Sequence, residues 1–256
     1  MNQRSFAPRE RLDGQVAVIA GGAGAIGSAT AQRLAALGAR CVLLQRLPPP
    51  SAQHLLASLP GSGHLVVCAS VTDSASLAGA AAQVLAQAGG ATMLVNCAGF
   101  TQPVAPADLD GLTDELIDSV FAVTWRGSFA AIRAFAPQLR ASGDSLIVNV
   151  SSIAAFTGLG SNLAYAAAKA GVDALTKALA KTLGPQIRVL AVSPGVVDTA
   201  FVTGRDAGFN ERVGATLPLG RVGVADDVAA AVTACATTLR YATGSVFVVD
   251  GGRSLG

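Results

Sequence analysis

Residues 148–177 read VNVSSIAAFTGLGSNLAYAAAKAGVDALTK. The apolar run at 146–150, which leads into this stretch, predicts a buried strand. The segment 163–182 is rich in alanine, leucine and lysine and contains no proline, a composition that predicts a helix. Tyr165 and Lys169 are four positions apart on this helix, so their side chains lie on the same face.

The pairing of Tyr165 with Lys169 has a chemical consequence. A tyrosine in water has a pKa of about 10, too high for a base near neutral pH. We expect the Lys169 ammonium to favour the phenolate and so lower the pKa of Tyr165 into the range that acid–base catalysis needs. Ser152, at the end of the strand, can hydrogen-bond the same substrate oxygen. The alternative is a packing aromatic beside a solvated lysine, and the rest of the chain decides between the two.

The composition predicts one α/β domain with a large core, because 51% of the 256 residues are hydrophobic and only 13% are charged. A net charge of +2 implies neither a nucleic acid nor an acidic membrane surface as partner. No apolar run reaches transmembrane length or forms a signal peptide. The four cysteines lack C-x-x-C spacing and the two histidines lack a ligand cluster, which favours a cytoplasmic protein without a metal site.

Strand and helix patterns alternate along the chain. Strands are expected at 16–20, 39–44, 64–68, 92–96, 145–150, 187–192 and 245–249. Helices are expected at 28–37, 53–59, 73–88, 163–182 and 226–237, with two helices or one broken helix at 112–139. This order predicts a doubly wound, Rossmann-like parallel sheet of seven strands with helices on both faces. We expect a flexible arm at 1–12, a single domain at 13–256 and a substrate lid at 199–217.

A glycine-rich turn, GGAGAIG at 21–27, joins the first strand to the first helix. Glycines let a backbone approach a pyrophosphate, and a helix N-terminus offers free amides and a positive dipole end. Within a strand–helix–strand unit, such a loop predicts a dinucleotide site. The alternative is a turn that only packs the helix on the strand.

These motifs, over essentially the whole chain, resemble those of the short-chain dehydrogenase/reductase family. The matching residues are, in order, Gly21 and Gly27, Asn96-Cys97-Ala98-Gly99, Ser152, Tyr165 with Lys169, Pro194-Gly195, Thr199 and Asp250-Gly251-Gly252. Each piece is modest, whereas the ordered set is specific. The resemblance implies a nicotinamide dinucleotide cofactor and hydride transfer to a carbonyl or from an alcohol.

The resemblance also implies residue roles. Tyr165 would be the acid/base, Lys169 would hold the nicotinamide ribose and lower the tyrosine pKa, and Ser152 would orient the substrate oxygen. Thr199 would bind the carboxamide, and the backbone after Pro194 would face the nicotinamide. The implied cofactor-binding set is Gly21, Ala25, Ile26, Gly27, Gln45, Arg46, Ser70, Val71, Asn96, Ala98, Gly99, Tyr165, Lys169, Pro194, Gly195, Val197 and Thr199.

Several positions depart from the family pattern. Ala25 replaces the middle glycine, Ser70 replaces an aspartate near the adenine, and Cys97 replaces the second asparagine of NNAG. Thr124 stands where an asparagine often completes a catalytic tetrad by holding a water of the proton relay behind the lysine. A threonine hydroxyl can contact water without an amide's geometry, so Thr124 is a fourth catalytic candidate.

The end of the second strand bears on the choice between NADP and NAD. A carboxylate there binds the ribose hydroxyls and repels a 2′-phosphate, and this chain has Gln45 and Arg46 instead. Arg46 can pair with a phosphate, which favours NADP; the alternative is a solvated loop charge.

The substrate pocket is expected to be apolar, lined by Ala154, Phe156, Leu159, Val196, Phe201, Val202 and Phe209. We therefore expect a neutral ketone or secondary alcohol; Arg205 or Arg212 on the lid are the cations that a charged substrate would need. The arm and the apolar segment 244–256 suggest contacts in a homo-oligomer, and the family is commonly tetrameric. The competing hypothesis is a catalytically weak nucleotide-sensing or scaffold protein, which Thr124, Ser70 and Ala25 keep open.

Overall fold

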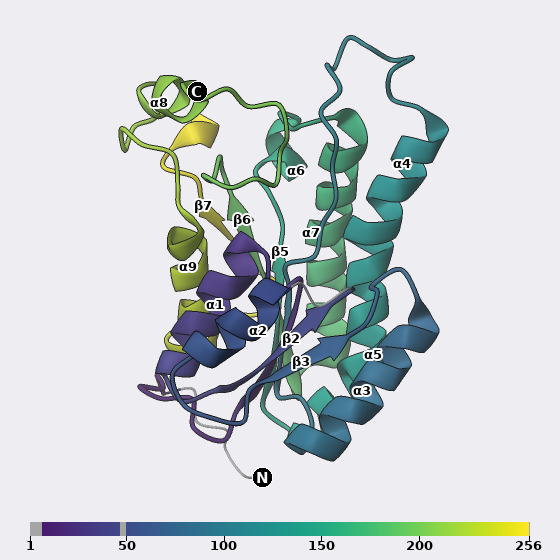
Figure 1. Ribbon diagram of the computed structural model, residues 1–256, viewed down its shortest axis with the longest axis vertical. Helices are drawn as coiled ribbons and strands as arrows, with labels where there is room; N and C mark the ends of the chain where they lie inside the picture. Colours follow the sequence, from purple (N-terminus) through teal and green to yellow (C-terminus); the bar gives the residue numbers. More distant parts are fainter. Residues whose placement is uncertain (1–6, 47–49, 256) are drawn as a thin grey trace.

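The structure, a computed structural model, describes residues 7–46 and 50–255. These residues form one seven-stranded sheet covered by helices on both faces (Figure 1). The strands are β1 (Val16–Ala20), β2 (Arg40–Gln45), β3 (Leu65–Cys68), β4 (Met93–Asn96), β5 (Ser145–Val150), β6 (Ile187–Pro194) and β7 (Val246–Val249). Their order is β3-β2-β1-β4-β5-β6-β7, and every neighbouring pair is parallel. The predicted fold class is confirmed.

Helices connect the strands as the alternation predicts. They are α1 (Ala25–Ala36), α2 (Pro50–Ser58), α3 (Ser74–Ala88), α4 (Asp114–Phe121), α5 (Gly127–Ser142), α6 (Ala154–Thr157), α7 (Leu163–Leu183), α8 (Phe209–Gly214) and α9 (Ala225–Thr237). The expected break at 112–139 is a π-helical turn, η1 (Ala122–Arg126), between α4 and α5. The short helices α6 and α8 were not expected, because single turns leave no periodic pattern. None of the described helices combines the length and apolarity needed to cross a bilayer.

The strand order places the site. The chain runs outward from β1 to β3 and then returns to β4 on the other side of β1. Where connections leave a parallel sheet in opposite directions, a crevice opens at the carboxyl ends of the strands. The glycine turn follows β1 and the Asn-Cys-Ala-Gly turn follows β4, so both lie at this crevice.

The sheet is buried on both faces, as its parallel strands require. Alternate residues of each strand enter two separate cores. One core packs the sheet on α3, α5 and α7, with Phe135 fully buried at its centre. The other packs it on α1 and α9 around Leu34 and Val232. Figure 1 shows these two groups of helices on opposite sides of the sheet.

The described part of the expected N-terminal arm is held on the domain. Arg9 pairs with Asp144 at 2.7 Å, and its backbone N–H donates to the Thr237 carbonyl at 2.9 Å. Leu12 is only 1% exposed. Residues 1–6 lie outside the described residues, so the flexible arm remains a prediction for them alone.

A buried polar chain ties the central strands to α7. The Asn96 amide donates to Asn149 Oδ1 at 2.9 Å, and the Asn149 amide donates to Thr176 Oγ1 at 2.9 Å. All three side chains are 3% exposed or less. Asn149 therefore supplies a hydrogen-bond partner to the Asn96 amide on one side and to the Thr176 hydroxyl on the other.

We expect Asn149→Ala to lower the free energy of unfolding by about 2–3 kcal/mol. The Asn96 amide and the Thr176 hydroxyl would each lose a hydrogen-bond partner in the buried interior, where water cannot replace it. Urea unfolding followed by circular dichroism measures this. Gln87→Ala on the exposed face of α3 is the matched control. A loss no larger than that of the control would show that the chain of hydrogen bonds contributes nothing.

Candidate active site

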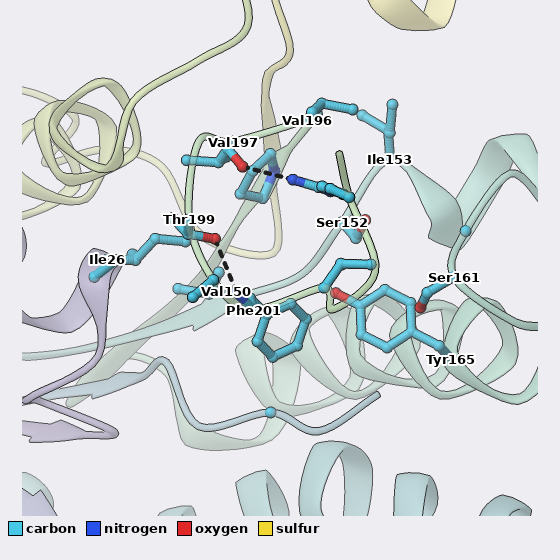
Figure 2. Close-up of a pocket in the computed structure, with 18 of the residues that line it drawn as sticks. Ile26, Val150, Ser152, Ile153, Ser161, Tyr165, Val196, Val197, Thr199 and Phe201 are labelled. Atoms are coloured by element: carbon cyan, nitrogen blue, oxygen red, sulfur yellow. Dashed lines mark hydrogen bonds between the residues drawn. The ribbon is translucent and has the colours of Figure 1, made fainter. Parts of the chain in front are cut away.

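A cavity of about 850 Å³ opens at the carboxyl ends of the central strands. The predicted residues that line it are Gly21, Ala25, Ile26, Gly27, Gly99, Ser152, Tyr165, Lys169, Pro194, Gly195, Val197 and Thr199. Figure 2 shows that they come from the glycine turn, the end of β5, the start of α7 and the segment after β6. The structure thus brings together most of the candidates that lie far apart in the sequence.

The glycine turn forms one end of this cavity. Gly21 has a φ of +75°, a conformation that side chains rarely adopt. A Cβ at Gly27 would collide with the Gly21 carbonyl oxygen and lie 2.8 Å from Gly22 Cα. Ala25 is the first residue of α1, so its methyl group is compatible with the helical backbone. The turn keeps the N-terminus of α1 open, as a bound pyrophosphate would need.

Tyr165 is positioned by the start of α7. Asn162, which is 1% exposed, caps this helix by accepting the Tyr165 N–H at 2.7 Å. The Asn162 amide also donates to the Gln102 carbonyl at 2.7 Å, which anchors the cap. Asn162 was not among the predicted site residues, although an asparagine directly before a helix is a recognisable capping signal. Ser152 and Tyr165 face the same cavity in Figure 2.

Lys169 lies buried beside Tyr165. It is 5% exposed, its Nζ donates to the Val150 carbonyl at 2.6 Å, and it lies 5.6 Å from the centre of the Tyr165 ring. Burial lowers the pKa of Lys169 to about 8, against the opposing effects of Cys97 and Asp173. The Lys169 Nζ is therefore held by a carbonyl oxygen, and its burial weakens its preference for the charged ammonium form.

The expected lowering of the tyrosine pKa is not found. Burial raises the pKa of Tyr165 to about 12, and the Ser152 hydrogen bond offsets only part of the rise. The physical reason is that loss of water disfavours the phenolate and the ammonium alike. Tyr165 is thus held protonated at neutral pH, the state that can donate a proton to a carbonyl oxygen.

The segment after β6 forms the opposite wall. Thr199 Oγ1 accepts the Phe201 N–H at 3.4 Å, and the Val197 carbonyl accepts from Arg205 Nη1 at 3.0 Å (Figure 2). The Phe201 ring lies 6.0 Å from the Tyr165 ring, centre to centre. Phe201 also lies against Gly99, where an added Cβ would be 3.5 Å from the ring. The expected lid segment therefore reaches across to the turn after β4.

The substrate end of the cavity is mainly apolar. Of the expected residues, Leu159, Val196, Phe201, Val202 and Phe209 line it, whereas Ala154 and Phe156 do not. The Arg205 guanidinium lies 4.7 Å from the centre of the Phe209 ring. Arg212 is instead paired with Asp206 at 2.6 Å and does not line the cavity. Arg253, which the sequence analysis did not single out, does line it.

Several other predicted cofactor residues do not line the cavity: Gln45, Arg46, Ser70, Val71, Asn96 and Ala98. With its amide oxygen turned to the glycine turn, Gln45 accepts the N–H groups of Gly22, at 2.7 Å, and Ala23. Ser70 Oγ lies 2.8 Å from Thr72 Oγ1. Asn96 is engaged with Asn149 inside the sheet. Gln45, Ser70 and Asn96 are thus bound to neighbouring protein groups, and Arg46 is exposed at the end of β2. A cofactor-binding role for these residues stays a prediction.

Thr124 is fully buried in the π-helical turn and does not line the cavity. Its hydroxyl lies 3.5 Å from both the N–H and the carbonyl oxygen of Phe100. The hydroxyl is thus used by the backbone after β4, so its expected role in a relay stays a prediction.

A nicotinamide dinucleotide fits these residues. The open N-terminus of α1 suits a pyrophosphate, the Lys169 ammonium suits a ribose hydroxyl, and the end of β6 with Thr199 suits the amide-bearing ring. Such a cofactor would give or take a hydride, and Tyr165 would give or take the proton. Among the described residues, no group of three or more histidine, cysteine or acidic side chains is arranged to hold a metal.

The fold and the site define a dinucleotide-dependent oxidoreductase. The chain belongs to the short-chain dehydrogenase/reductase family: the family profile described as enoyl-(acyl carrier protein) reductase matches residues 21–254.

Similar proteins agree with this assignment. D-threitol dehydrogenase of Mycolicibacterium smegmatis is 36% identical over 252 residues, which are 96% of this chain and 95% of that protein. Cis-4-hydroxycyclohexanecarboxylate dehydrogenase of Sinomonas cyclohexanicum is 35% identical over 242 residues, 93% and 96% of the two chains. The crystal structure of levodione reductase superposes with a TM-score of 0.87 at 27% identity, covering 96% of this chain and 100% of that one.

We expect Thr124→Asn to raise kcat with little change in cofactor affinity. An asparagine offers one acceptor and two donors, so it can keep a contact to the Phe100 backbone and still hold a water. The gain should be below the roughly 10²-fold with which positioned proton transfer begins to contribute. Steady-state kinetics across pH, with the solvent isotope effect, measure it. An unchanged or lower kcat would mean that the proton takes another route or that another step limits the rate.

Proposed function

We propose that this protein interconverts a neutral ketone and a secondary alcohol with a nicotinamide dinucleotide as the hydride carrier. The observation that carries the proposal is the pairing of Ser152 with Tyr165 at an apolar cavity, with Lys169 buried beside them. The names of the relatives support it, since they are dehydrogenases of hydroxyl compounds and a ketone-type reductase.

In the direction of reduction, the carbonyl carbon receives the hydride and the Tyr165 hydroxyl gives its proton to the carbonyl oxygen. Ser152 donates a hydrogen bond to the same oxygen and fixes its position. Lys169 binds the cofactor ribose and stabilises the phenolate left on Tyr165. Oxidation of the alcohol runs through the same steps in reverse.

The competing hypothesis, a scaffold or nucleotide sensor, has no need of Ser152, Tyr165 and Lys169 together. A panel of ketones with NADPH or NADH, followed by nicotinamide absorbance, separates the two. Turnover of at least one ketone supports the enzyme, and dinucleotide binding without turnover of any would favour the sensor.

Tyr165→Phe should abolish turnover and leave dinucleotide binding nearly intact, because the ring stays and only the proton donor is removed. The comparison is kcat from the absorbance assay against Kd from cofactor fluorescence. Phe201→Leu, a change on the facing wall that keeps an apolar contact, is the control for altered packing around the ring. Activity of Tyr165→Phe near that of the wild type would remove Tyr165 from the acid/base role.

We further propose NADP as the preferred cofactor. Arg46 is exposed at the end of β2 and forms no ion pair with the described residues. Gln45 beside it is neutral and bound to the glycine turn, so no carboxylate repels a 2′-phosphate at this point.

If Arg46 binds the 2′-phosphate, Arg46→Ala should weaken NADP binding by about 1.5–3 kcal/mol, the range for hydrogen bonds to charged groups, and leave NAD binding unchanged. Calorimetric titration with both dinucleotides measures this. Arg140→Ala, an exposed arginine at the end of α5, controls for the loss of one positive charge. Equal effects on both cofactors, or none, would make Arg46 a surface charge only.

Two further proposals concern the setting of the enzyme. A homo-oligomer, a tetramer or a dimer, is supported by the edge strand β7 and by exposed apolar side chains near it: Val248 is 47% exposed, Leu255 84% and Leu219 72%. A cytoplasmic location is supported by four free cysteines, of which Cys68 is exposed.

A further inference from the structure

A third ionisable side chain lies on the catalytic face of α7. Asp173 follows Lys169 by four positions, as Lys169 follows Tyr165, so the three side chains are stacked along one side of the helix. The Oδ1 atom of Asp173 is buried and forms no hydrogen bond within ordinary distance and angle limits to a described residue, although the Ser151 hydroxyl interacts with the carboxylate. Burial of a carboxylate oxygen that lacks a good hydrogen bond is unfavourable in free energy, so the position of Asp173 needs a physical explanation.

Cations and a hydroxyl surround this carboxylate. The Ser151 hydroxyl, directly after β5, acts on it most strongly, and Lys177 and Lys169 lie one turn on either side of it along α7. Burial raises the pKa of Asp173, and these three groups oppose the rise. Across the site, Cys97 also faces Lys169, but burial raises the pKa of this thiol to about 12, which leaves it neutral. Asp173 is thus the carboxylate that acts on the Lys169 ammonium.

Lys169 has a specific need for such a carboxylate. Its burial disfavours the ammonium, and its one hydrogen bond among the described residues goes to a neutral carbonyl, that of Val150. A neutral lysine cannot stabilise the phenolate of Tyr165. Thr124, which takes the place of the family's asparagine, has its hydroxyl beside the Phe100 backbone.

We propose that Asp173 is a positioning residue that keeps Lys169 protonated, and that it supplies from within α7 the support for the lysine that Thr124 does not give. The inference rests on the proposed function, in which Lys169 acts as a cation. A carboxylate one turn away on the same helix face stabilises the ammonium without touching substrate or cofactor.

Asp173→Asn tests this, because it keeps the shape and removes the charge. The pKa of Lys169 is about 8 in the wild type and should fall by roughly 0.5–1.5. This is the range expected for the loss of one charge one helical turn away, in a medium whose dielectric constant lies between those of protein and water. Because the ammonium is present below its pKa and lost above it, the alkaline fall of kcat for ketone reduction should begin at correspondingly lower pH. At about pH 6, where Lys169 is charged in both proteins, kcat should agree within about twofold.

The chain permits a direct measurement of this titration. Its three lysines are Lys169, Lys177 and Lys181, and the last two are exposed. NMR of protein labelled at the lysine ε-carbon therefore gives three signals, among which Lys169 stands out by its lowered pKa and by its loss in Lys169→Arg. The titration needs neither substrate nor turnover.

Two variants complete the design. Asp173→Glu keeps the charge and should restore both the lysine pKa and the pH profile toward those of the wild type. Asp118→Asn removes an exposed carboxylate on α4 and should change neither. Circular dichroism checks that each variant is folded.

An unchanged Lys169 titration in Asp173→Asn would overturn the proposal. So would a uniform loss of kcat with the pH profile in place, since that is the signature of a structural role. If no ketone is turned over at all, the proposed function fails, while the NMR titration still decides whether Asp173 holds the charge on Lys169.

Discussion

The hydrogen bond of 2.6 Å from Lys169 to the Val150 carbonyl joins the helix that carries Tyr165 to the end of the strand that leads to Ser152. Without it, a buried ammonium in this position would have no hydrogen-bond acceptor. With it, the start of α7 is tied to the end of β5. Tyr165, one turn earlier, then faces the cavity into which Ser152 also projects.

The same burial that makes this geometry rigid sets the proton chemistry. Removal of water raises the pKa of Tyr165 and lowers that of Lys169, so both groups are shifted toward their neutral forms. A protonated tyrosine is ready to act as an acid, but the phenolate it leaves behind needs a positive charge beside it. In the proposed reaction the site depends on the groups that keep Lys169 charged, so residues behind the lysine matter as much as those that face the cavity.

Much of this arrangement could be predicted from the sequence. The seven strands are apolar runs of parallel-sheet type, and their order with the helices allows few topologies. That Ser152, Tyr165 and Lys169 line one cavity could be predicted because strand ends and helix faces are local properties. The contacts of Gln45, Asn96 and Thr124 could not be found, since each depends on a residue or loop distant in the sequence: the glycine turn, β5 and the backbone after β4. The predicted lowering of the Tyr165 pKa was wrong for a related reason, because burial is a property of the folded chain.

Three residues that depart from the family pattern, Ala25, Ser70 and Thr124, are accommodated by their neighbours in the fold. Ala25 sits in the first turn of α1, where a methyl group causes no clash, and Ser70 and Thr124 have oxygens within hydrogen-bonding distance of neighbours in their own walls. Ala25 adds only a methyl group and removes no polar side chain, whereas Ser70 and Thr124 stand where the family has the longer polar side chains of aspartate and asparagine. Tyr165, Lys169 and Asp173 share one face of α7, whereas Arg205, Asp206 and Arg253 line the cavity from the segments after β6 and β7. The proposed reaction, in which Lys169 acts as a cation, therefore depends on the electrostatics of that face of α7.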